Sequence, residues 1–115
     1  IDFLNIVNKN MDETQLLESC MDDQEFVKEI LQCFVESFNK IFKTINDSIS
    51  NNSYSDTSLY KYFHSIKSSA KQIYYQEIVD LAASVELQLT HTVDLDNVTR
   101  NLNQIKKLVD NINII

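Results

Sequence analysis

Residues 22–50, DDQEFVKEILQCFVESFNKIFKTINDSIS, contain a long run of apolar side chains at helical spacing. These side chains recur in steps of four and three residues, at Leu31, Val35, Phe38, Phe42, Ile45 and Ile49, with Ile30, Phe34 and Ile41 beside them. Such spacing predicts an amphipathic helix, and the width of the apolar face predicts that it is buried on two sides. Asp22, followed three residues later by Glu25, is a capping pair at its start.

Three further amphipathic helices are predicted after this one. The polar run 51–55 predicts a loop, after which Ser55 or Asp56 caps the next helix. A tight joint near Tyr75 and a cap at Asp94 separate the last two helices. Their inward positions are Leu59, Phe63, Ile66, Ala70 and Ile73, then Ile78, Leu81, Ala82, Val85 and Leu89, and finally Leu95, Val98, Leu102, Ile105, Val109 and Ile112.

The segment before the long helix is predicted to form two short helices. The first uses Phe3, Leu4 and Val7, and the second uses Leu16, Leu17 and Cys20. Asn10 followed by Glu13 is the capping signal between them. We therefore predict one all-α domain over residues 1–115: an antiparallel up-down-up-down four-helix bundle over about 22–115, covered at one end by short helices over about 1–21.

The composition fits a small helical domain of the cytoplasm. The 115 residues include no Gly and no Pro, which argues against hairpins and phosphate-cradling loops. The net charge of −7 disfavours nucleic acid and anionic membranes as partners, and no stretch approaches the roughly 20 apolar residues of a membrane span. No secretory signal is visible. Cys20 and Cys33 are isolated, and we expect both to be buried in a reducing compartment.

His64 is the candidate nucleophile. It follows the core position Phe63 by one residue, about 100° around the helix, which places the imidazole at the edge of the buried face. Its base is then anchored while its tip reaches water, and much of an exposed imidazole is neutral and nucleophilic at pH 7. We predict that His64 accepts a phosphoryl group; an ordinary surface histidine is the alternative. His91 lies in a predicted joint and is not expected to be the acceptor.

Three lysines surround His64 on its predicted helix. Lys67 and Lys71 follow one and two turns after it, and Lys61 precedes it by three residues. We predict that Lys67 stabilises phosphoryl charge, and that Lys61 and Lys71 help an acidic partner pocket to dock. A solvated cationic strip is the alternative.

Glu86 is predicted to lie beside His64. Each is 11 residues from Tyr75, so an antiparallel helix pair that turns there brings them to the same height. The carboxylate can then accept a hydrogen bond from one ring nitrogen and leave the other nucleophilic. A solvent-facing Glu86 is the alternative. Two such ligands without a third at helical spacing do not predict a metal site.

The segment from His64 to Tyr74, HSIKSSAKQIY, resembles the signature of histidine phosphotransfer (HPt) domains, His-x-Leu-Lys-Gly-Ser-x-x-x-Leu-Gly. The positions that match in place or conservatively are His64, Ile66, Lys67, Ser69 and Ile73. The resemblance extends over most of the chain, and the phosphoacceptor domain of chemotaxis histidine kinases looks similar, including a glutamate at this distance. Two positions depart from the signature, since Ser68 and Tyr74 stand where the family has Gly.

The resemblance implies reversible transfer between a phospho-aspartate of a response-regulator receiver domain and His64. The receiver would bring the Mg²⁺, so this chain would need no cofactor or metal, and a sensor or hybrid histidine kinase would be the other partner. Tyr60, Ser65 and Ser68 join the lysines as candidate docking residues, the serines because they are small. Tyr74 disfavours the left-handed backbone that Gly adopts freely, so its joint must differ or carry strain.

Other functions stay open on the sequence. The chain can be the phosphoacceptor segment of a larger histidine kinase, or a degenerate HPt-like helical module that binds without transferring phosphate. An independent enzyme is not expected, because the sequence has no P-loop, no Ser/His/Asp set and no metal-ligand cluster. We expect a monomeric phosphocarrier.

Overall fold

The computed structural model describes residues 11–112 and 114, and within them the chain is all-helical, as predicted. Five helices and no strand occur in these residues. They are α2 (Glu13–Ser19), α3 (Gln24–Ser50), α4 (Asp56–Gln72), α5 (Gln76–Leu89) and α6 (Leu95–Asp110). The short helix predicted around Phe3, Leu4 and Val7 lies outside the described residues.

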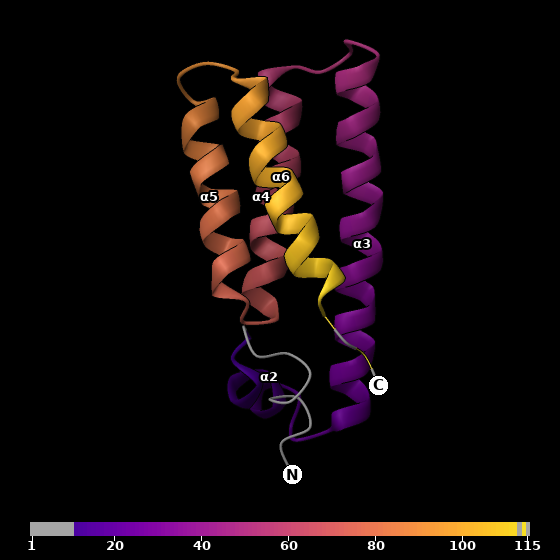
Figure 1. Cartoon of the computed structure of the whole chain (residues 1–115). Helices are drawn as coiled ribbons and strands as arrows, with labels where there is room; N and C mark the ends of the chain where they lie inside the picture. Colours follow the sequence, from indigo (N-terminus) through magenta and orange to yellow (C-terminus); the bar gives the residue numbers. More distant parts are fainter. Residues whose placement is uncertain (1–10, 113, 115) are drawn as a thin grey trace.

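Helices α4, α5 and α6 lie alongside the upper part of α3, and the joints between successive helices alternate between the two ends of the molecule (Figure 1). The most extensive contact is between α4 and α5. Helix α2 lies below them, near the lower end of α3 (Figure 1). The backbone N–H of Asp12, just before α2, donates a hydrogen bond to the carbonyl oxygen of Tyr74 at 3.1 Å. This contact ties the start of α2 to the α4–α5 joint.

Side chains cap the start of four of the helices. Ser55 caps α4 in a reciprocal pair with Ser58, and Asp94 caps α6, both at predicted positions. The cap of α3 is Asp23 and not Asp22, because Asp22 has a positive φ of 61° and lies in the joint after α2. The cap of α2 is Asp12, whose carboxylate accepts from the N–H of Gln15.

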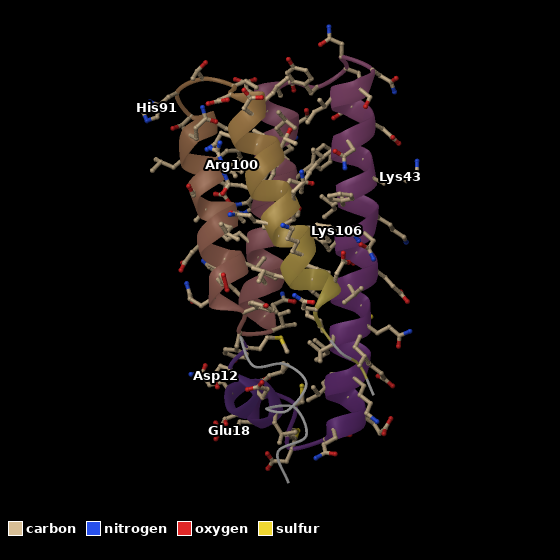
Figure 2. The ribbon with its side chains drawn as sticks, viewed as in Figure 1. Asp12, Glu18, Lys43, His91, Arg100 and Lys106 are labelled. Carbon is tan, nitrogen blue, oxygen red and sulfur yellow. The ribbon has the colours of Figure 1, made fainter. Side chains whose placement is uncertain are left out.

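The core runs along one face of each long helix. On α3 the most buried positions are Val27, Leu31, Phe34, Phe38 and Ile45. Three positions that the sequence predicted to be inward are only half-buried, namely Val35, Phe42 and Ile49. The reason is that α3 makes few contacts with the neighbouring helices. Lys106 of α6 contacts two of the side chains on α3. Its Nζ donates to Oδ1 of Asn39 at 3.1 Å and lies 5.4 Å from the ring centroid of Phe42 (Figure 2).

The α4–α5 joint keeps a left-handed backbone although it contains no glycine. Tyr74 has φ 57°, a conformation that costs roughly 1–2 kcal/mol for a residue with a Cβ atom. Its ring is half-buried and packs against the core, which offsets part of that cost. Of the two outcomes predicted for this position, the structure has the strained one.

The prediction that both cysteines are buried is wrong for Cys33. Cys20, which caps the end of α2, is buried, but Cys33 is exposed, and both are free thiols. Cys33 follows Leu31 by two residues, about 200° around α3, so it points away from the core face. It borders a hollow of about 290 Å³ between α3 and α4.

Candidate functional site

Helix α4 presents His64 at the edge of its buried face. Phe63 and Ile66, on either side of it in the sequence, are fully buried in the core. The His64 side chain remains 56% exposed. The backbone at His64 is therefore held by packing, while the imidazole itself reaches solvent.

Glu86 of α5 faces His64 from the neighbouring helix. Val85 beside it is in the core, and the Glu86 side chain is only 7% exposed. Its Oε1 lies 3.4 Å from Nδ1 of His64. The antiparallel register around Tyr75 thus brings a nearly buried carboxylate to one edge of the imidazole.

The His64–Glu86 contact has the distance of an ion pair but not the geometry of a hydrogen bond. No donor among the described residues makes a hydrogen bond with Oε1 of Glu86, although this oxygen is buried. A buried carboxylate oxygen without a donor is costly. We therefore interpret the contact as an electrostatic one between the carboxylate and the Nδ1 edge of the ring.

Lys67 holds the other oxygen of the same carboxylate. Its Nζ donates to Oε2 of Glu86 at 2.9 Å, and its side chain is 20% exposed. Glu86 therefore lies between a lysine ammonium and a histidine ring. Sequence reasoning placed all three residues at the site but missed this pairing, because it treated Lys67 as a free cation. Its role toward a phosphoryl group stays a prediction.

Tyr60 stacks on the imidazole of His64. The two ring centroids are 6.2 Å apart and the ring planes differ by 10°. The pair is four residues apart on α4, the spacing at which side chains of a helix meet. The sequence indicated only that Tyr60 shares a face with His64; the parallel stacking depends on rotamers that a sequence does not specify.

The remaining predicted docking residues form an exposed strip on α4. Its members, here called the α4 strip, are Tyr60, Lys61, Ser65, Ser68 and Lys71. Lys61 and Lys71 are the exposed cations of this strip, since the ammonium of Lys67 is paired with Glu86. Ser68, which stands where the signature has Gly, is also exposed.

His91 belongs to a different part of the molecule. It is exposed in the joint between α5 and α6 and points outward, away from the helices (Figure 2).

In the described part of the chain, no group of three or more His, Cys, Asp or Glu side chains is arranged to hold a metal ion. Across that same part, none of the helices has the length and hydrophobicity needed to cross a bilayer.

Comparison with protein-family models matches residues 29–113 to the Hpt domain. The match covers most of the chain and includes His64, Lys67 and Glu86. The chain belongs to the Hpt domain family. Hpt domains act in histidine phosphotransfer in two-component signalling, and the resemblance seen in the sequence is thereby confirmed. No curated protein and no solved structure matches the chain.

The Hpt match indicates which requirements the site has to meet. A phosphotransfer histidine must be fixed in the protein while one ring nitrogen remains accessible. His64 has a half-exposed ring, a carboxylate at Nδ1 and an aromatic ring against one face. His91 has no such contact among the interactions of the described residues.

Proposed function

We propose that this Hpt domain accepts and donates a phosphoryl group on Nε2 of His64. The observation that carries the proposal is the 3.4 Å approach of Glu86 to Nδ1 of an otherwise half-exposed imidazole. Because the carboxylate favours a proton on Nδ1, the lone pair is left on Nε2, across the ring. Nε2 is therefore the nucleophile.

The proposed transfer needs no general base. The Nε2 lone pair attacks the phosphorus of a phospho-aspartate, the phosphorus–oxygen bond breaks, and the aspartate leaves as a carboxylate. The proton stays on Nδ1, so the phosphorylated ring carries a positive charge. Glu86, 3.4 Å away, stabilises that charge, and the same steps in reverse return the phosphoryl group. The chain contributes mainly the position of the ring.

The proposed partners are receiver domains of response regulators and a sensor or hybrid histidine kinase. The receiver would supply the Mg²⁺ and the acidic pocket, and this chain would need no cofactor of its own. Lys61 and Lys71 support docking of such an acidic pocket, since they are the exposed cations near His64 on a chain of net charge −7. We propose that the chain acts as a monomer in the cytoplasm.

The up-down-up-down order predicted for the long helices is part of this proposal. It is supported by the alternating joints of α3, α4, α5 and α6 (Figure 1). Antiparallel α4 and α5 are what bring Glu86 to the height of His64. The strained backbone at Tyr74 also supports the proposal, because it keeps the α4–α5 joint tight without glycine.

Phosphate uptake by the purified chain tests the proposal. The chain is incubated with phosphorylated receiver domains, and the label is tested for stability in alkali and lability in acid. We expect such label on the wild-type chain and none on His64→Gln, with His91→Gln labelled like the wild type. Label retained by a folded His64→Gln variant would refute His64 as the acceptor. No label from any of several receivers would indicate a module that binds without transferring.

A further inference from the structure

We infer that Lys67 changes partners when His64 is phosphorylated, leaving the carboxylate of Glu86 for the new phosphoryl group. The inference rests on the proposed function, and it gives Lys67 two successive roles. Before phosphorylation its ammonium pairs with Glu86, as it does in the structure. Afterwards it stabilises the phosphoryl charge, as the sequence predicts, and the phosphorylated ring becomes the partner of Glu86.

The Glu86 carboxylate faces two groups, but only one of them satisfies it. Its Oε2 accepts a hydrogen bond from Nζ of Lys67 at 2.9 Å. Its Oε1 lies 3.4 Å from Nδ1 of His64, is buried, and accepts no hydrogen bond from the described residues. The Glu86 side chain is only 7% exposed, and removing the counter-charge of a buried carboxylate is strongly destabilising. Lys67 can therefore leave only if another cation replaces it.

Phosphorylation on Nε2 supplies that replacement. The neutral imidazole of His64 becomes a cation that keeps its proton on Nδ1, at the edge of the ring that faces Oε1 of Glu86. The same step adds a phosphoryl group with negative charge and several acceptor oxygens. Glu86 can then pair with the ring while Lys67 pairs with the phosphoryl group. Neither the buried carboxylate nor the phosphoryl group is left without a counter-charge.

Lys67 is placed to make this exchange. It follows His64 by three residues on α4, the spacing at which side chains of a helix are neighbours. The Lys67 side chain is 20% exposed and that of His64 is 56% exposed, so solvent borders both groups. Lysine has a flexible four-carbon stem, and rotation about its bonds moves the ammonium without moving the helix.

Unfolding in urea, with and without a phosphoryl group on His64, tests the exchange. All proteins carry His91→Gln, so that His64 is the only imidazole. Phosphoramidate is the donor and needs no protein partner: the ring nitrogen attacks phosphorus, the phosphorus–nitrogen bond breaks, and ammonia leaves with the electron pair of that bond. Lys67→Met is compared with Lys40→Met, which removes the same charge from an exposed position on α3.

We expect Lys67→Met to lower the urea midpoint of the unphosphorylated chain, because Glu86 loses its cation. In the phosphorylated chain the loss should be at most about half as large, since the ring now pairs with Glu86 and an exposed contact between lysine and phosphoryl group adds little stability. The phosphorus NMR signal should also move in Lys67→Met. Lys40→Met should change neither the midpoint nor the phosphorus signal.

An equal loss of urea midpoint in the two states would overturn the inference, because Lys67 would still be paired with Glu86. A phosphorus signal unchanged by Lys67→Met would overturn it as well. A measurement on the wild-type chain covers the case in which Lys67→Met does not fold. The ammonium signal of Lys67 in nitrogen NMR, assigned by its absence in Lys67→Arg, should move on phosphorylation, and an unmoved signal would overturn the inference.

Failure of the inference is distinct from failure of the proposed function. If phospho-receivers do not label the chain at His64, the proposed function fails, whereas the comparison with phosphoramidate can still be made because it depends only on this chain. If receivers label His64 but Lys67→Met loses equal stability in both states, only the inference fails.

Discussion

Replacing Glu86 with glutamine removes a charge at the site while keeping the shape of the side chain. The amide oxygen of Gln can still accept from Lys67, which now contacts Oε2 at 2.9 Å. The amide N–H₂ then faces Nδ1 of His64 in place of the carboxylate oxygen Oε1 and can donate to it. That reversal favours a proton on Nε2 and removes the lone pair needed for attack.

The size of the expected loss in transfer rate follows from the distance between Glu86 and His64. At the 3.4 Å that separates Nδ1 from Oε1, two unit charges attract by about 1 kcal/mol in water and about 5 kcal/mol at an effective dielectric constant of ~20. The imidazole is half-exposed, and Lys67 offsets part of the carboxylate charge. We therefore expect Glu86→Gln to lose about 1–3 kcal/mol of stabilisation of the charged, phosphorylated ring, or roughly 5- to 150-fold in transfer rate.

The assay is the rate of phosphoryl transfer from a phosphorylated receiver, measured at saturating receiver so that docking does not limit it. Glu77→Gln, an exposed carboxylate on the same helix, is the matched control and should transfer at the wild-type rate. Unfolding by urea checks that both variants remain folded. Transfer by Glu86→Gln at the wild-type rate would refute the role of the carboxylate in selecting Nε2.

Three further predictions concern stability and accessibility. Lys67→Met should lower the free energy of unfolding in urea by about 1–3 kcal/mol, because it leaves the buried Glu86 carboxylate without its donor. Adding Glu86→Leu to this variant should recover most of the lost stability. Equal stability of Lys67→Met and the wild type would contradict this. Tyr74→Gly should be more stable than Tyr74→Ala by about 1 kcal/mol, since both lack the ring and only Gly adopts φ 57° freely. A higher melting temperature for the Ala variant than for the Gly variant would show that the joint is unstrained. Cys33 should react with iodoacetamide in the native protein while Cys20 should not, which mass spectrometry of the alkylated chain would reveal; native labelling of Cys20 would contradict its burial.

The helices and most of their ends could be predicted because they depend on neighbours in the sequence. Asp94 caps where the sequence placed it, and Ser55 is one of the two caps predicted for α4, since a capping side chain bonds to N–H groups only two or three residues away. Asp22 was the wrong cap of α3, because two adjacent aspartates carry the same local signal. The left-handed backbone at Met21 and Asp22 is what selects Asp23.

Cys33 shows where a residue-type rule fails. Cysteine is among the residue types most often buried, and that tendency predicted a buried thiol. Its place on α3, about 200° from Leu31, is set by helix geometry, and α4 leaves an open hollow beside it. The position on the helix outweighs the preference of the side chain.

The amino-acid sequence alone was sufficient to single out His64 as the candidate phosphoacceptor and to place Glu86 near it. Both conclusions follow from helical periodicity and from counting residues on either side of one joint. The contacts that surround these two residues, and the backbone of the joint between their helices, came only from the tertiary structure. Lys67 pairs with Glu86, Tyr60 stacks on His64, and Tyr74 adopts a left-handed backbone. Each of these depends on rotamers, on the rotation of α4 against α5 and on how closely the two helices approach, and the packing of the whole core sets those quantities.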